Sequence, residues 1–406
     1  MSNETSIPKG ATVTLSFVEG DLMVGSHATV KGEESSSPVK VSGTIYCEGN
    51  NIFDCSLSAA GLEAEGNIKI RGDLEVKNNI EVSDGYLEVD GNVSAASIEA
   101  DEALVVHGKL ESEGIDVGGS LRVDGDVKAE SIDVGGSFRA KGEIHAEDVD
   151  VGGSLEAEAR VQLGSLSVGG TARVGGGKIR EIDAGGCFES SAPLEFEDIE
   201  VGGAVSLAGK SKGDRIEVGG TLRVQGDLEF REIDVGGKID ISGSAAGEEL
   251  EVGGKISVNG ALKLSGDLEV GGKAEVSGEI EAENIEVGGV LRSKKVQTQN
   301  HIEVGGRIAT DEGATARFIE IGKRGEAKGT LRADEIIVGK DAHVEDVYGK
   351  RILLRNGAHA RNVYGEEITV ESECRIEGEI LYVNELRASS QVAFAKQPQK
   401  VNTLPF

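Results

Sequence analysis

The sequence is poor in the residue types that fill the cores of large globular domains. Its 406 residues include no Trp, 5 Pro and only 3% aromatic residues. Because aromatic side chains supply much of an ordinary core, we expect one thin, elongated core instead. No stretch approaches about 18 consecutive apolar residues, and residues 1–10 lack the basic and apolar regions of a secretory signal. We therefore expect neither a membrane-spanning helix nor export.

Cysteine and positive charge are also scarce. The cysteines Cys47, Cys55, Cys187 and Cys374 show neither C-x-x-C pairs nor the spacing of a disulfide framework, which favours a reducing, cytoplasmic compartment. Lys and Arg number 42 against 72 Asp and Glu, so the net charge is −30. That charge repels phosphates and anionic lipids. We expect no nucleic-acid partner and no membrane association.

Glycine is abundant, with 60 residues, and much of it follows one recurring phrase. The phrase is an aliphatic residue, an acid and Val before Gly-Gly, as in I-D-V-G-G at 115–119. The residue before the glycines, called here the anchor, recurs at Val117, Val134, Val151, Val168, Ala184, Val201, Val218, Val235, Val252, Val270, Val287, Val304, Ile321 and Val338. The mean step between successive anchors is a 17-residue period, from which only two steps deviate. A fixed period of this length is typical of a solenoid.

Each 17-residue unit alternates apolar and polar residues with the period of a strand. The unit 115–131 contains three apolar pairs with a spacing of two, Ile115/Val117, Leu121/Val123 and Val127/Ala129, separated by Gly, Asp and Ser. The position two before the anchor is aliphatic in all 14 units and is expected to point inward. The Gly-Gly corner is expected because stacked coils approach closely there and because glycine tolerates positive φ. The pattern predicts an all-β fold, a three-sided parallel β-helix (β-solenoid) built from 17-residue coils.

The regularity of the repeat divides the chain into segments. We expect a disordered N-terminus at 1–10, degenerate β-helix coils at 11–114 with a loop near 32–38, and the regular array at 115–340. A 16-residue sub-repeat marks further coils at 341–387. Residues 388–406 lose the alternation and are expected to fold back as a tail or cap, with Phe394 and Leu404 as its apolar contacts.

The block 339–386 contains the phrases G-A-H-A-R-N-V-Y-G and C-R-I-E-G-E-I-L-Y-V-N-E-L. With the 17-residue coils, these phrases resemble the bactofilins, polymer-forming cytoskeletal proteins of bacteria and archaea, and in particular the longer archaeal members. The resemblance covers about residues 40–387, although a typical bactofilin has a much shorter rod. It implies a right-handed β-helix and a cytoskeletal or scaffold protein that polymerises end to end without nucleotide or holds protein partners.

Enzyme chemistry has little support in the sequence. The histidines His27, His107, His145, His301, His343 and His359 invite comparison with left-handed hexapeptide-repeat enzymes, the alternative reading, but a coil of three hexapeptides is one residue longer than the period found here. His343 and His359 lie one coil apart and could stack within about 5 Å, yet no third metal ligand recurs with them. There is no phosphate-binding G-x-x-x-x-G-K-[ST], no G-x-S-x-G and no H-E-x-x-H. We expect no catalytic residue, cofactor or metal.

The residue just before each anchor is acidic in 12 of the 14 units. These residues are Asp116, Asp133, Asp150, Asp183, Glu200, Glu217, Asp234, Glu251, Glu269, Glu286, Glu303 and Glu320; Ser167 and Ile337 are the exceptions. Stacked coils would place the carboxylates about 4.8 Å apart, where like charges destabilise one another. Water and salt screen such a row, or cations or a basic partner occupy it. The second possibility leaves open a monomeric binding rod.

Overall fold

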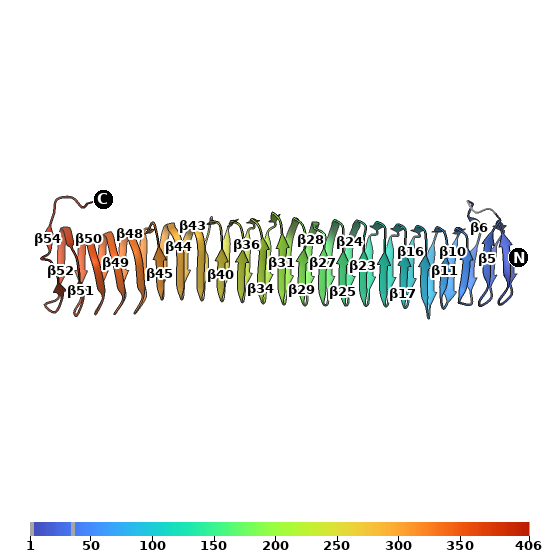
Figure 1. The fold of residues 1–406 in the computed structure, drawn as a ribbon, viewed down its shortest axis with the longest axis horizontal. Helices are drawn as coiled ribbons and strands as arrows, with labels where there is room; N and C mark the ends of the chain where they lie inside the picture. Colours follow the sequence, from blue (N-terminus) through green and yellow to red (C-terminus); the bar gives the residue numbers. More distant parts are fainter. Residues whose placement is uncertain (1–3, 34–36, 406) are drawn as a thin grey trace. The chain divides into compact units, whose positions relative to one another are not determined.

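A computed structural model describes residues 4–33 and 37–405. These residues form 54 β-strands and contain no helix, so none of them forms a helix that could cross a bilayer. The all-β prediction is confirmed. The chain divides into two compact units, Met1–Gly202 (unit 1) and Gly203–Phe406 (unit 2). Each unit is a stack of short parallel strands (Figure 1).

The strands of unit 1 are β1 (Glu4–Ile7), β2 (Thr12–Leu15), β3 (Phe17–Val18), β4 (Asp21–Val24), β5 (Thr29–Gly32), β6 (Val39–Val41), β7 (Thr44–Cys47), β8 (Asn51–Asp54), β9 (Leu57–Ala59), β10 (Gly61–Glu65), β11 (Ile68–Ile70), β12 (Leu74–Val76), β13 (Asn79–Ser83), β14 (Tyr86–Val89), β15 (Val93–Ser94), β16 (Ser97–Ala100), β17 (Ala103–Val106), β18 (Leu110–Glu111), β19 (Gly114–Val117), β20 (Ser120–Val123), β21 (Val127–Lys128), β22 (Ser131–Val134), β23 (Ser137–Ala140), β24 (Ile144–Val151), β25 (Ser154–Ala157), β26 (Val161–Val168), β27 (Thr171–Val174), β28 (Gly177–Ala184), β29 (Cys187–Ser190) and β30 (Leu194–Val201).

The strands of unit 2 are β31 (Ala204–Ala208), β32 (Ser211–Lys212), β33 (Arg215–Val218), β34 (Thr221–Gln225), β35 (Leu228–Glu229), β36 (Glu232–Val235), β37 (Lys238–Ile241), β38 (Ala245–Gly247), β39 (Glu249–Val252), β40 (Lys255–Val258), β41 (Leu262–Leu264), β42 (Leu268–Val270), β43 (Lys273–Val287), β44 (Val290–Val304), β45 (Arg307–Thr310), β46 (Ala314–Thr315), β47 (Phe318–Ile321), β48 (Glu326–Val338), β49 (His343–Leu354), β50 (His359–Val370), β51 (Arg375–Ile376), β52 (Ile380–Ala388), β53 (Ala393–Phe394) and β54 (Gln399–Lys400).

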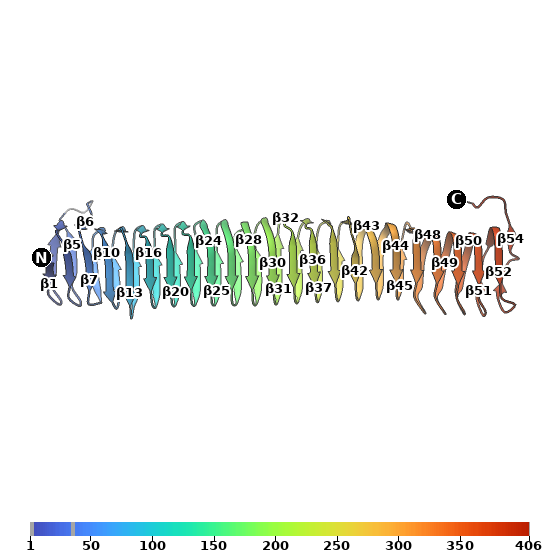
Figure 2. The same cartoon turned by 180° about the vertical axis from the view of Figure 1, so that it is seen from behind.

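Three strands make one turn of the solenoid. In unit 1, β10 pairs in parallel with β7 before it and with β13 after it, three places along the chain in each direction. Where one strand runs over two or three sides of a turn, the step is shorter, so β24 pairs with β26 and β43 with β44. In unit 2 the same step joins β33 to β36, with Ile216 beside Ile233. Figures 1 and 2 show this stacking from opposite sides. The predicted three-sided, 17-residue coil is therefore confirmed.

The core of each unit is a set of aliphatic rows along the stack. The residues two before the anchors are all at most 3% exposed: Ile115, Ile132, Val149, Leu166, Ile182, Ile199, Ile216, Ile233, Leu250, Leu268, Ile285, Ile302, Ile319 and Ile336. Alternation directs them inward, because successive side chains of a strand point to opposite faces. Each fully buried aliphatic side chain contributes about 1.5–3 kcal/mol. The thin, elongated core expected from the composition is the core of each unit.

The Gly-Gly corners owe their glycines to close packing alone. A Cβ on Gly135 would lie 2.2 Å from the carbonyl oxygen of Gly118, and one on Gly136 would lie 2.5 Å from that of Gly119. Neither residue has positive φ, which occurs at other glycines such as Gly226, with φ of 139°. The expectation that positive φ contributes at these corners is therefore wrong. The stacking distance leaves no room for a side chain.

The N-terminal predictions are partly wrong. Residues 4–7, expected to be disordered, form β1 and pair with β4, because Ile7 packs beside Val24 and is 3% exposed. Ile7 is the only apolar residue of β1, so the sequence shows no apolar alternation there. The predicted loop near 32–38 lies between β5 and β6, but residues 34–36 fall outside the described residues, as do residues 1–3.

The tail prediction is also corrected. The first part of the tail does not fold back: β53 pairs in parallel with β51, and β54 pairs with β52, so these strands continue the stack in register. Beyond β54 the chain runs back alongside the stack, as expected (Figure 1). Phe394 lies beside Ile376, which agrees with its expected apolar contact, and Leu404 is half-buried. The short strands form because backbone groups of β51 and β52 offer an edge that must be paired. The tail up to β54 is a last, incomplete layer of unit 2.

Candidate functional site

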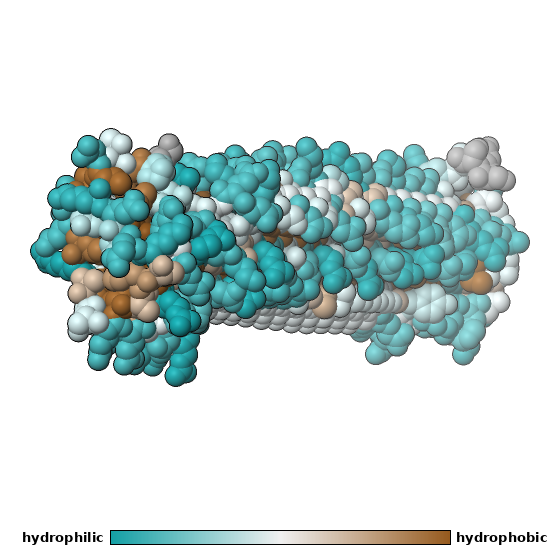
Figure 3. Space-filling view, turned by 60° about the vertical axis from the view of Figure 1, so that its left-hand side comes forward, coloured by the Kyte–Doolittle hydropathy of each residue, from teal (hydrophilic) through white to brown (hydrophobic). Residues whose placement is uncertain are grey.

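The C-terminal end of unit 2 is a strand edge with incompletely covered apolar side chains. On β52, Leu381, Val383 and Leu386 are half-buried, whereas Ile376 and Ile380 just before them are only 1% exposed. Figure 3 shows hydrophobic side chains gathered on this end, which faces the viewer. Within the described residues, β53 and β54 each pair on one side only. An open parallel edge with apolar side chains is a surface on which another strand can add.

The first turn of unit 1 has a similar edge. It consists of β1, β2 and β3, which pair with β4, β5 and β6 and, within the described residues, with no strand on their other side. Val13 and Leu15 on β2 are half-buried, and Phe17 on β3 is 61% exposed. An exposed Phe beside unpaired backbone groups favours aggregation of a monomer, and it contributes apolar contact area when the edge forms an interface.

A row of carboxylates follows one face of each unit, as the repeat predicted. In unit 1, Asp116 lies beside Asp133 and Asp133 beside Asp150. The row begins earlier than expected, because Glu63, Glu81 and Glu99 occupy the same position in the degenerate coils. Their phrases L-E-A, I-E-V and I-E-A carry the same signal without the glycines. In unit 2 the row runs without interruption through Glu217, Asp234, Glu251, Glu269, Glu286, Glu303 and Glu320.

Few cations lie against this row. Arg215 pairs with Glu217 at 3.0 Å, and His301 pairs with Glu286 at 3.1 Å between Nε2 and Oε1. Glu269 lies between Glu251 and Glu286. Its pKa is raised, first by partial desolvation and then by the charges of Glu286 and Glu251. At Glu269 the neighbouring carboxylates therefore add to the cost of carrying a charge.

The different surroundings of two glutamates of unit 2 predict opposite effects when each is replaced by glutamine. Glu269→Gln should stabilise slightly, because the folded state raises the pKa of Glu269 and so disfavours its charged form at neutral pH. Glu275→Gln should destabilise, because Lys255 and Lys273 hold Glu275 at 2.8 and 2.6 Å and lower its pKa to about 2. Each effect should be within about 1 kcal/mol. Chemical denaturation of both variants at neutral pH measures them.

The dependence of stability on pH supplies a control for these two variants. The Glu275 contribution is present above the usual Glu pKa and is lost as pH falls toward about 2, so its variant should differ least in acid. The penalty at Glu269 disappears as pH falls through its raised pKa, so Glu269→Gln should also converge on the parent there. A stabilising Glu275→Gln, or a strongly destabilising Glu269→Gln, would show that something other than these charges controls the two sites.

The C-terminal coils stack two pairs of rings, of which the sequence predicted the histidine pair. The rings of His343 and His359 lie 4.5 Å apart, and those of Tyr348 and Tyr364 lie 4.6 Å apart. The Arg332 guanidinium lies 4.8 Å from the Tyr348 ring. Desolvation, and then the neighbouring His343, lowers the pKa of His359. Among residues 4–33 and 37–405, no third His, Cys, Asp or Glu joins the two histidines as a metal-ligand group.

One group of side chains that could hold a metal was missed. Glu88, Asp90 and His107 come together in unit 1, from two successive turns in the degenerate region. The sequence named His107 but offered no reason to join it to Glu88 and Asp90, because these turns lack the Gly-Gly anchor that fixes the register. Counting one period of the repeat from Asp90 to His107 would have placed the two at one corner.

The cysteines offer no obvious nucleophile in the core. All four are free, and burial raises the pKa of the Cys47 thiol to about 12. Burial, and then Asp54, raises the pKa of Cys55 to about 11. A thiol with a raised pKa is rarely ionised and reacts slowly. These two cysteines act as small core or corner residues.

Comparison with known proteins returned no relative: no protein-family model, no curated protein and no solved structure matches the chain.

Proposed function

We propose that this chain is a structural protein, similar to bactofilins, whose β-solenoid coils associate end to end without nucleotide. The observation that carries the proposal is the pair of open edges. β1–β3 begin unit 1, and β52–β54 end unit 2, with half-buried apolar side chains at each edge. A terminal coil gains stability by finding a second neighbour, because coils of a solenoid depend on stacking.

The remaining features fit a structural role in the cytoplasm. Four free cysteines suit a reducing compartment, and the inward side chains of each turn are mostly aliphatic and stabilise the stack. The acidic row keeps lateral faces charged and so opposes side-by-side aggregation. Association is then directed to the ends. If other proteins bind the acidic row along such a polymer, the polymer would serve as a cytoskeletal scaffold.

Sedimentation velocity at several protein concentrations, with and without added ATP or GTP, tests this function. Association that increases with concentration and is indifferent to nucleotide is the expected result. Phe17→Lys, which places a charge at the edge of unit 1, should weaken it, whereas Tyr86→Lys, on an exposed side of β14 away from either edge, should leave it unchanged. A monomer at every concentration would contradict the proposal.

A further inference from the structure

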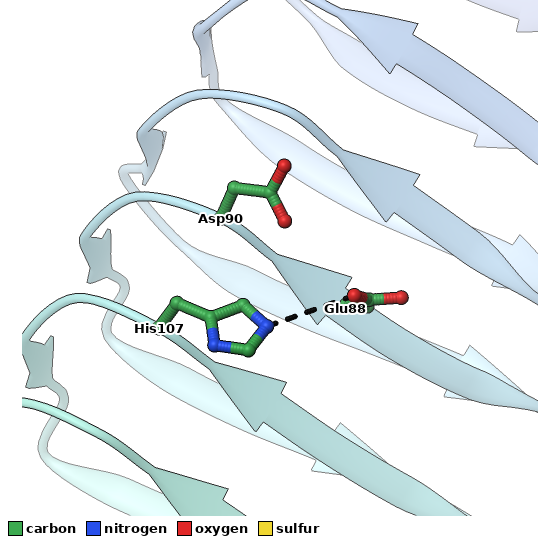
Figure 4. Close-up of side chains that lie close together, drawn as sticks. All are labelled: Glu88, Asp90 and His107. Atoms are coloured by element: carbon green, nitrogen blue, oxygen red, sulfur yellow. Dashed lines mark ion pairs between the residues drawn. The ribbon is translucent and has the colours of Figure 1, made fainter.

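A second kind of site lies on the surface of unit 1, away from the strand edges. Glu88 is on β14, Asp90 directly follows β14, and His107 directly follows β17, the strand stacked on β14. Figure 4 shows the three side chains together on the outer surface of two successive turns. One ligand atom from each lies within 4.8 Å of the others.

The local register explains why these side chains meet. Val89 pairs with Val106, so the residues that follow them, Asp90 and His107, share a corner one layer apart. Glu88 precedes the buried Val89 and therefore points outward beside that corner. The group is fixed by the stacking of the solenoid and does not depend on a long loop.

The imidazole of His107 is held in one orientation. Its Nδ1 lies 2.7 Å from Oδ2 of Asp124, which directly follows β20 on the next turn. An ionised carboxylate only accepts hydrogen bonds, so Nδ1–H is the donor and Nε2 carries the lone pair of the neutral ring. That nitrogen lies 3.6 Å from Oε1 of Glu88 (Figure 4). When the ring is neutral, Nε2 of His107 and Oε1 of Glu88 therefore each direct a lone pair toward the space between them.

Asp124 is itself fixed as an anion. Nζ of Lys141 lies 2.8 Å from its Oδ1, and Nη2 of Arg122 lies 3.4 Å from the same oxygen. These two cations and the N–H of His107 thus surround the Asp124 carboxylate and stabilise its ionised form. A carboxylate that accepts the distal N–H of a histidine is the common supporting partner of a histidine that binds metal, since it sets the tautomer and increases the basicity of the ligand.

We propose that Glu88, Asp90 and His107 form a binding site for a divalent transition-metal ion of the Zn²⁺ type. Zn–N and Zn–O bonds of about 2.0–2.2 Å at a tetrahedral angle place two ligand atoms about 3.3–3.6 Å apart. The 3.6 Å between Nε2 of His107 and Oε1 of Glu88 meets this distance. One imidazole and two carboxylates suit Zn²⁺ rather than Mg²⁺ or Ca²⁺, which take oxygen ligands. Water completes the coordination.

Lys69 is the built-in competitor of the metal. Its Nζ lies 2.7 Å from Oε1 of Glu88 and 3.7 Å from Oδ1 of Asp90, so an ammonium balances the two carboxylates in the absence of metal. A divalent ion must displace this ammonium, which has a long, flexible stem and is partly exposed. The site therefore binds more weakly than its ligand set alone would allow. Removing the Lys69 charge should strengthen binding.

Metal titration of the full-length chain after treatment with a chelator tests the proposal. Calorimetry with Zn²⁺ should show a site that His107→Ala abolishes and that Lys69→Met tightens several-fold. Asp124→Ala, which removes the support for the imidazole, should weaken binding about 10–100-fold. Co²⁺, as a spectroscopic probe, should give the visible absorption of a tetrahedral ion in the parent and, at higher concentration, in Asp124→Ala.

Three controls separate this site from other weak metal binding. His145→Ala removes an exposed histidine of unit 1 that lies 3.8 Å from Glu143 and should change nothing. His359→Ala tests the stacked histidines of unit 2 and should also leave the site unchanged. Circular dichroism should confirm that every variant keeps the β-fold. Zn²⁺ binding that His107→Ala leaves unchanged would overturn the proposal. Binding that appears only in Lys69→Met would also overturn it, and would show that Lys69 is the cation that occupies the site.

Discussion

Gly136→Ala should destabilise unit 1 by about 1–3 kcal/mol, toward the upper end of this range for an overpacked site. The added Cβ would lie 2.5 Å from the carbonyl oxygen of Gly119. That oxygen belongs to the backbone of the coil below, so a rotamer change cannot relieve the contact. The corner must shift, and the neighbouring hydrogen bonds of Gly136 N to Gly119 O and of Gly153 N to Gly136 O must shift with it. Thermal and denaturant unfolding measure the loss.

Gly114→Ala is the matched control in the same unit. A Cβ at Gly114 would meet only Oγ of Ser131, at 3.6 Å, which is an ordinary contact. Because Ala loses less backbone entropy than Gly in a strand, the variant should be neutral or more stable by about 0.5–1 kcal/mol. Hydrogen exchange should localise the Gly136→Ala effect to adjacent coils, since solenoid coils interact mainly with their neighbours. Equal effects from both variants would refute close packing as the cause of the corner glycines.

Deleting residues 389–406 should strengthen end-to-end association at least about tenfold, which corresponds to about 1.4 kcal/mol. The deletion removes β53 and β54 and uncovers the edges of β51 and β52. Ile376 loses Phe394, and the backbone of β52 loses the bond that Val401 N donates to Tyr382 O. Unpaired strands with apolar side chains then favour pairing with another chain. Sedimentation at matched concentrations gives the change in association constant.

A charge at the uncovered edge should reverse this effect. Ile380→Lys in the shortened chain places an ammonium at a position that is 1% exposed in the full chain, and burying it in an interface is costly. Ile380→Val keeps the edge apolar and should still associate. If the deletion leaves the assembly state unchanged, the tail is a passive extension and the last layer does not limit association.

The repeat makes most of the fold predictable from the sequence. In each coil, the anchor phrase identifies a strand, the corner that follows it and the side chain that points inward. Because coils stack one period apart, the phrase also identifies neighbouring residues, such as Ile115 and Ile132. The His343–His359 stack followed from the same counting. Prediction failed where a coil lacks the phrase. β1 holds one apolar residue, Ile7, and β53, which pairs with β51, is only two residues long.

Surface chemistry was less predictable than the core. The acidic row was visible because every member occupies one position of the repeat. The Glu88, Asp90 and His107 group depends instead on side chains that differ from turn to turn and on Asp124, which lies one full turn beyond His107. A repeat predicts what is shared between coils. It does not reveal which combination of unshared side chains forms a site.

Electron microscopy of the purified full-length chain, without nucleotide and over a range of protein concentrations, tests the central claim most directly. End-to-end association of the open edges predicts unbranched filaments one solenoid wide, which become longer as concentration rises and shorter in Phe17→Lys. Separate particles of constant length at every concentration, with the chain folded by circular dichroism, would contradict assembly through the ends.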